Sequence, residues 1–114
     1  MSMYALLKET LLENTFLAYK RGLFAGTSGN LSCLDATGTK IAITPSSYAY
    51  EKMTLDDIVI IEASGGAVVE GKRKPSSEWR MHAAIYREVP GTCGVVHIHS
   101  PYATALATAG KGIP

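Results

Sequence analysis

Residues 58–70 carry the most regular strand pattern of the chain: Ile58-Val59-Ile60-Ile61-Glu62-Ala63-Ser64-Gly65-Gly66-Ala67-Val68-Val69-Glu70. The run at 58–61 is short, β-branched and continuous, which predicts a central strand of a sheet. The Ser-Gly-Gly segment at 64–66 predicts a tight turn, and 67–70 predicts the returning strand of a hairpin. The stretch therefore indicates a sheet that contains antiparallel strands.

The patterns on both sides of this hairpin alternate between helix and strand. The spacing of leucines and aromatics predicts an amphipathic helix over 2–21, which Gly22 would stop. The remaining elements follow in order: a strand leaving the loop 26–32, a turn at 35–38, a strand at 40–43, a helix after a serine cap at 75–78, a strand at 94–99 and a helix opening at Ser100. This order predicts an α/β sandwich around a largely antiparallel sheet.

Composition sets limits on the class of protein. The chain has 114 residues, with 11 basic and 10 acidic side chains and a net charge of +1, so we expect neither nucleic acid nor membrane as a partner. No apolar run is long enough to span a bilayer, and the first residues lack a secretory cleavage site. Cys33 and Cys93 lie far apart, which suits reduced thiols in the core of a cytoplasmic protein.

The strongest single chemical pattern is His97-Ile98-His99. Residues two apart on a strand face the same side, so both imidazoles can reach one metal ion. The alternative is one packing histidine and one solvated histidine at a strand edge.

A second pattern is Glu78 behind Ser76 and Ser77 at a predicted helix start. The simple interpretation is capping, in which a serine oxygen accepts an amide hydrogen bond. The functional interpretation is a phosphate held by the hydroxyls and free amides, beside a carboxylate that acts as general acid or base.

Two further polar loops have the same ambiguity. Gly29 and Asn30 end a glycine-rich loop whose amides could approach an oxyanion, and Ser46 and Ser47 follow Thr44 and a proline. Each is also an ordinary turn sequence. His82 shares a helix face with Glu78, and we interpret it as a buried, hydrogen-bonded structural histidine rather than a ligand.

Taken in order, the motifs Gly26-Thr27-Ser28-Gly29-Asn30-Leu31-Ser32, Thr44-Pro45-Ser46-Ser47, Pro75-Ser76-Ser77-Glu78 and His97-Ile98-His99-Ser100 resemble the class II aldolase/adducin amino-terminal family. The resemblance covers essentially the whole chain. It implies a three-layer α/β/α sandwich on a mainly antiparallel sheet, assembled as a homotetramer with active sites between subunits.

The resemblance also implies roles for individual residues. Glu78 matches the catalytic acid/base, and its neighbours Trp79-Arg80-Met81-His82 are most similar to the fuculose-phosphate aldolase branch. His97 and His99 match two of three zinc ligands. The positions that match phosphate-binding loops are Gly29, Asn30, Ser46, Ser47, Ser76 and Ser77.

The implied activity is a zinc-dependent, reversible retro-aldol cleavage of a 2-ketose 1-phosphate, such as L-fuculose 1-phosphate, to dihydroxyacetone phosphate and an aldehyde. Alternatives are an L-ribulose-5-phosphate 4-epimerase-like enzyme, and a non-catalytic adducin-like interaction module or inactive fragment.

By the same resemblance, the third zinc histidine and a substrate-side tyrosine would lie beyond Pro114. We therefore expect 1–114 to be a single domain that is incomplete at its carboxyl end. Glu78, or less readily His82, could then supply the third ligand.

Overall fold

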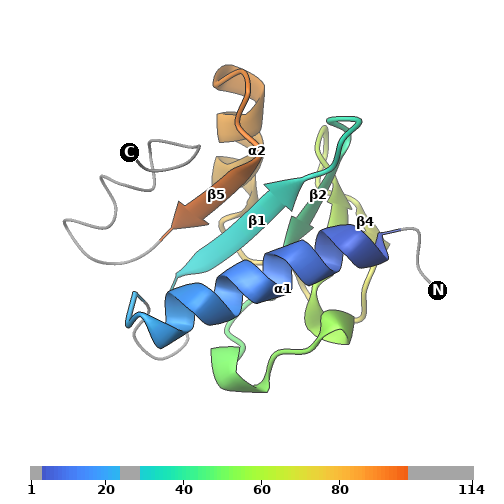
Figure 1. Cartoon of the computed structure of the whole chain (residues 1–114). Helices are drawn as coiled ribbons and strands as arrows, with labels where there is room; N and C mark the ends of the chain where they lie inside the picture. The colour runs from blue at the N-terminus through green and yellow to red at the C-terminus, as the bar shows by residue number, and fades with distance from the viewer. Residues whose placement is uncertain (1–3, 24–28, 98–114) are drawn as a thin grey trace.

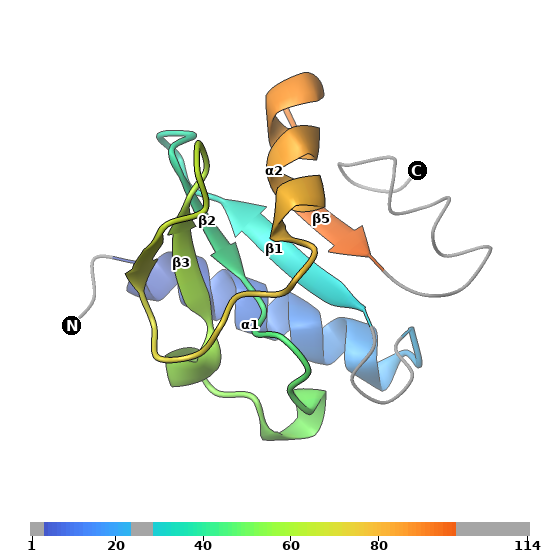
Figure 2. The ribbon, with the colours of Figure 1, turned by 180° about the vertical axis from the view of Figure 1, so that it is seen from behind.

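The computed structural model describes residues 4–23 and 29–97, in which five antiparallel strands form one sheet with helices on both faces (Figures 1 and 2). The strand order in the sheet is β4-β3-β2-β1-β5. The elements are α1 (Ala5–Lys20), β1 (Asn30–Leu34), β2 (Lys40–Ile43), the short 3-10 turns η1 (Tyr50–Lys52) and η2 (Leu55–Asp57), β3 (Val59–Glu62), β4 (Val68–Glu70), α2 (Trp79–Glu88) and β5 (Gly94–His97).

Two apolar clusters, one on each face of the sheet, make the fold a three-layer α/β/α sandwich. Successive side chains of a strand point to opposite faces, so β2 and β3 contribute to both clusters. The α1 side holds Leu11, Ala18, Leu31, Ala42, Tyr50, Met53, Ile58 and Ile60. The α2 side holds Ile41, Ile43, Val59, Ile61 and Ala83. The predicted fold class is confirmed.

Helix α1 has the predicted place, and the leucines and Phe16 of its predicted apolar pattern pack against the cluster on that face of the sheet. Lys8, Leu11, Thr15 and Ala18 are the buried positions. Lys8 reaches the carboxylate of Glu70 on β4, and the Thr15 hydroxyl donates to the carbonyl of Leu11 at 2.7 Å, so both polar side chains have partners. The helix ends as predicted at Gly22, whose φ of 73° suits the left-handed position after a helix.

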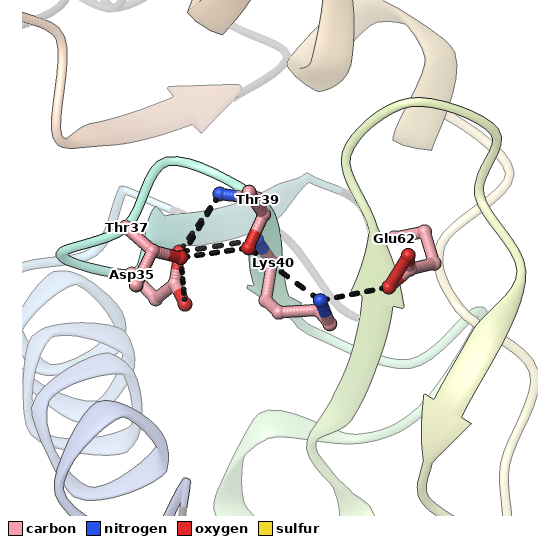
Figure 3. A network of polar contacts seen from close by, with 5 residues as sticks. All are labelled: Asp35, Thr37, Thr39, Lys40 and Glu62. Carbon is pink, nitrogen blue, oxygen red and sulfur yellow. Dashed lines mark hydrogen bonds and ion pairs between the residues drawn. The ribbon is translucent and has the colours of Figure 1, made fainter.

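The hairpin between β1 and β2 is closed by a polar network at its turn (Figure 3). The carboxylate of Asp35 accepts hydrogen bonds from the amides of Thr39 and Lys40, each at 3.0 Å. Lys40 Nζ in turn lies 2.9 Å from Glu62 Oε1 on β3. These contacts set the register of three strands at the turn, far from the end of the sheet where β1 begins.

The hairpin at 58–70 is confirmed, with β3 as an interior strand between β2 and β4. Its turn also positions α2, because the Trp79 ring packs directly over Gly66. A Cβ added at Gly66 would lie 2.5 Å from Trp79 Cζ2, and the φ of Gly66 is +75°. Only glycine therefore allows the hairpin turn to contact the first turn of α2.

Several expectations need correction or lie outside the described residues. Neither Ser76 nor Ser77 occupies the N-cap position of α2. The helix begins one residue later than a serine cap requires, so that Glu78 is the N-cap. Cys33 and Cys93 are free thiols, but Cys93 is exposed because it precedes edge strand β5. The helix expected from Ser100 is outside the described residues. Among the helices in the described part, none has the length and hydropathy to cross a bilayer.

Candidate functional site

The site lies at the end of the sheet where β1 begins and β5 ends. Asn30 opens β1 and pairs directly with His97, the last residue of β5. The next residue, Leu31, exchanges two hydrogen bonds with Thr44: its amide donates to the Thr44 hydroxyl at 3.1 Å, and its carbonyl accepts from the Thr44 amide at 3.0 Å. The described end of the glycine-rich loop, at 29–32, therefore lies beside the loop at 44–47; these are the first and second polar loops, and 75–78 is the third.

The second and third polar loops are joined by a short antiparallel bridge between Pro45 and Pro75. The Ser46 amide donates to the carbonyl of Lys74, and the Ser76 amide donates to the carbonyl of Thr44, both at 3.0 Å. Backbone hydrogen bonds hold these loops together, which leaves the Ser46 and Ser76 hydroxyls for other roles. The described parts of the three polar loops, at 29–32, 44–47 and 75–78, thus meet at one end of the sheet.

The four serines of the second and third polar loops differ in accessibility. Ser46, Ser47 and Ser77 are exposed, and Ser47 has a φ of 52° in the left-handed region. Ser76 is only 4% exposed, and its hydroxyl accepts the Glu78 amide at 3.1 Å. Ser76 thus accepts an amide hydrogen bond at the start of α2 without being its N-cap, whereas the exposed hydroxyls are placed where a ligand could reach them.

Glu78 and His97 approach each other from different elements, the start of α2 and the end of β5. Glu78 Oε2 lies 3.9 Å from His97 Nδ1, and their side chains are 45% and 19% exposed. A carboxylate oxygen and an imidazole nitrogen are both zinc donors, and two ligands of one tetrahedral zinc stand roughly 3.3 Å apart. The chemistry of this pair fits a metal site, and the two atoms lie farther apart than two ligands of one zinc.

The other predicted ligands do not complete the site within the described residues. His99 lies outside them, and the part of the chain that the structure describes contains no cluster of three histidine, cysteine or acidic side chains. His82 is not available as the substitute ligand, because both of its ring nitrogens are engaged in hydrogen bonds.

A buried polar network stands behind Asn30. His82 Nε2 contacts Asn30 Oδ1, His82 Nδ1 lies 2.6 Å from Ser32 Oγ, and Ser32 Oγ lies 2.7 Å from the Tyr86 hydroxyl. Burial, and then repulsion from His97, lower the pKa of His82 to about 4, so the imidazole is neutral at pH 7. The structural interpretation of His82 is confirmed.

The partners in this network could not be identified from the sequence, although the spacing of the residues contained a signal. Asn30 and Ser32 are two apart on a strand, and His82 and Tyr86 are four apart on a helix, so each pair shares one face. What the sequence does not show is that these two faces meet.

A second missed residue is Tyr50, which is 2% exposed. Its hydroxyl donates to the carbonyl of Gly29 at 2.5 Å, and burial raises the pKa of Tyr50 to about 12. Gly29 has a φ of 89°, so this contact holds the glycine in a conformation that other residues rarely adopt.

The arrangement gathers exposed hydroxyls, a buried amide side chain, a carboxylate and an imidazole at one end of the sheet. Hydroxyl and amide donors suit an anionic oxygen, whereas the carboxylate can move a proton.

Comparisons with known proteins identify the family to which this fold belongs. Residues 9–114 match the model of the class II aldolase and adducin N-terminal domain. An L-fuculose 1-phosphate aldolase superposes with a TM-score of 0.78 at 37% identity, over 93% of this chain and 49% of that protein. YgbL from Escherichia coli, provisionally described as an aldolase/epimerase/decarboxylase, gives 0.78 at 30% identity, over 92% and 49%.

The L-fuculose 1-phosphate aldolase from Glaciozyma antarctica PI12 gives a TM-score of 0.75 at 26% identity, over 95% of this chain and 45% of that one. This chain thus spans about half the length of the structures it matches. Because the family model covers nearly all of the sequence, the chain belongs to the class II aldolase and adducin N-terminal domain family.

Proposed function

We propose that this chain carries the phosphate-binding and proton-transfer parts of a zinc-dependent sugar-phosphate aldolase. The reaction is the reversible cleavage of a 2-ketose 1-phosphate, such as L-fuculose 1-phosphate, to dihydroxyacetone phosphate and an aldehyde. The observation that carries the proposal is the approach of Glu78 to His97 at 3.9 Å, beside the meeting point of the polar loops. The similarity to an L-fuculose 1-phosphate aldolase at 37% identity supports the choice of substrate class.

In this proposal the phosphate is held at the three polar loops. The exposed hydroxyls of Ser46, Ser47 and Ser77 donate to its oxygens, and so does the side-chain amide of Asn30. Gly29 contributes by the close approach of its backbone, and Ser76 acts by holding the Glu78 amide. Neutral and backbone donors can bind a phosphate without a lysine or arginine when several converge.

Glu78 is the proposed acid/base. In the synthetic direction its carboxylate takes a proton from the hydroxymethyl carbon of dihydroxyacetone phosphate, and in the cleavage direction it returns that proton. Its side chain is half-exposed, so a substrate bound at the serine loops can reach it. A positioned general base of this kind contributes ~10²–10⁴-fold to a rate.

His97 and His99, with Glu78 beside them, would hold the zinc ion, which when bound supplies Lewis-acid polarisation of the substrate's carbonyl and hydroxyl oxygens. The donor pair of His97 and Glu78 supports this assignment. We also propose that the chain, as one domain, works as a homo-oligomer. The exposed Val68 and Val69 on edge strand β4 offer an apolar surface for self-association.

The test is a comparison of two substrates with zinc-supplemented protein. We expect release of dihydroxyacetone phosphate from L-fuculose 1-phosphate, and a rate ~10²–10⁴-fold lower in Glu78→Gln. Glu88→Gln is the matched control, because Glu88 lies at the far end of α2 and its side chain is 69% exposed. Epimerisation of L-ribulose 5-phosphate without cleavage of the first substrate would favour the epimerase. Activity on neither would favour a non-catalytic module.

A further inference from the structure

We infer that His82 is a positioning residue that orients the side-chain amide of Asn30. It is part of a hydrogen-bond chain in which each donor points the same way, from Tyr86 through Ser32 and His82 to Asn30. The inference deepens the proposed function, and rests on it only for the identity of the anion that Asn30 meets. His82 itself is fully buried and touches no part of the surface.

The direction follows first from the Asn30 end of the chain. Asn30 Oδ1 can only accept a hydrogen bond, so His82 Nε2 must carry a proton. A neutral imidazole has one N–H, and the depressed pKa of His82 keeps the ring neutral at pH 7. His82 Nδ1 is therefore an acceptor, and the Ser32 hydroxyl donates to it across 2.6 Å.

The Tyr86 end of the chain is compatible with the same direction. A phenol oxygen carries one proton that it can donate, and it can also accept a hydrogen bond. The phenol can then direct its own proton to Ser32 Oγ at 2.7 Å. The Ser32 oxygen accepts from Tyr86 and donates to His82, so each hydroxyl in the chain uses its single proton once.

The consequence lies at the substrate side of Asn30. Because Oδ1 is held by His82, the Nδ2 group with its two N–H donors is the end of the amide left for a ligand. Reversal of the chain would turn the amide over and place a carbonyl oxygen toward the ligand. An oxygen acceptor repels phosphate, whereas an N–H donor binds it. The buried chain thus selects for an anion at Asn30.

The direction can be measured without any ligand. The ¹⁵N chemical shifts of the two His82 ring nitrogens, in the 114-residue protein at pH 7, distinguish the two neutral tautomers. We expect a protonated Nε2 and an unprotonated Nδ1. Protonation at Nδ1 instead would overturn the inference, whatever the protein binds.

The effect on ligand binding is measured with inorganic phosphate as the probe. In His82→Gln the side-chain oxygen and nitrogen replace Nδ1 and Nε2 as acceptor and donor, so we expect phosphate affinity close to that of the original protein. His82→Leu removes both groups, and we expect binding at least ~10-fold weaker, as for the loss of a hydrogen bond to a charged group. Circular dichroism confirms that each variant is folded.

The double variant His82→Leu/Asn30→Ala completes a cycle. If His82 acts through Asn30, the second substitution adds little to the first, and the losses are not additive. Unchanged phosphate affinity in a folded His82→Leu protein, or additive losses, would show a merely structural histidine. If the original protein binds no phosphate, the proposed phosphate site is wrong, while the tautomer still decides the direction of the chain.

Discussion

The carboxylate of Glu78 and the imidazole of His97 lie 3.9 Å apart, although 19 positions separate them in the sequence. The pairing arises because α2 starts at the same end of the sheet at which β5 ends. Neither residue has a role in the two apolar clusters, and both retain exposed surface. The approach of a carboxylate to an imidazole outside the apolar clusters is the basis of the prediction on zinc affinity that follows.

Zinc affinity should depend on both members of this pair. We expect His97→Ala to weaken zinc binding by more than the ~10–100-fold that loss of an outer-shell partner typically causes. Glu78→Gln should weaken it as well, whereas Glu88→Gln should not. Competition against a chromogenic chelator measures the affinity, in a Cys93→Ser background because Cys93 is an exposed thiol. Equal affinity in all of these proteins would exclude the pair as a metal site.

We expect Ser76 to contribute to stability and Ser77 to contribute to ligand binding. Ser76→Ala removes the acceptor for the Glu78 amide and should lower the free energy of unfolding by ~1 kcal/mol, as for a lost intramolecular hydrogen bond. Ser77 is exposed, so Ser77→Ala should change stability by less than ~0.5 kcal/mol but weaken phosphate binding. Urea unfolding and phosphate titration measure the two effects, and the reverse assignment would contradict this division.

The contact between Gly66 and Trp79 should be visible as a stability difference. Gly66→Ala places a methyl group against the indole ring, whereas Gly38→Ala has the same φ of +75° and nothing within 4 Å of the new Cβ. Both variants carry the backbone strain, so their difference isolates the ring contact. We expect the free energy of unfolding of Gly66→Ala to be ~1–3 kcal/mol lower than that of Gly38→Ala, by analogy with overpacked cores. Equal losses would mean that Trp79 moves aside freely.

Acid should remove the stabilisation that comes from Asp57. Although burial alone would raise the pKa of Asp57, hydrogen bonds from Arg73, at 2.5 Å, and from Thr54 hold its pKa below the usual value. A carboxyl whose folded pKa is lowered stabilises the protein above its unfolded pKa of about 4, and this contribution is lost as pH falls through the folded value. The contact also anchors the segment that leads to Ser76.

The measurement is urea unfolding of the original protein and Asp57→Asn between pH 7 and pH 2. We expect the variant to be ~1.5–3 kcal/mol less stable at pH 7, the range for hydrogen bonds to charged groups. The gap should narrow as pH falls below about 4. The comparison cancels acid effects that both proteins share, including that of buried His82. A gap that does not change with pH would mean that ionised Asp57 contributes nothing.

The sheet could be predicted from the sequence because its signals are local. The hairpin at 58–70 needs only two β-branched runs and a Ser-Gly-Gly turn between them. At Gly22, the backbone hydrogen bonds that end α1 join residues no more than five positions apart. Where the local signal was ambiguous, prediction was weaker. Two serines before α2 suggested a cap, but the helix begins after Glu78, and only Ser76 accepts an amide hydrogen bond.

The site could be predicted as a set of segments but not as an assembled geometry. The contact between Asn30 and His82 joins residues 52 apart, and its formation depends on how α2 lies across β1. Tyr50 reaches Gly29 from a short 3-10 turn whose sequence gives no hint of that role. Nonlocal contacts of this kind depend on the packing of whole elements, which a pattern in one segment does not contain.

The central claim, that Glu78 exchanges a proton with a phosphorylated ketose at this site, is tested most directly by isotope exchange. Zinc-supplemented protein is incubated with dihydroxyacetone phosphate in deuterated water, and loss of a hydroxymethyl proton is followed by ¹H NMR. We predict exchange with the original protein and with Glu88→Gln, and exchange ~10²–10⁴-fold slower with Glu78→Gln. Exchange at the same rate in Glu78→Gln, or none in the original protein, would contradict the account.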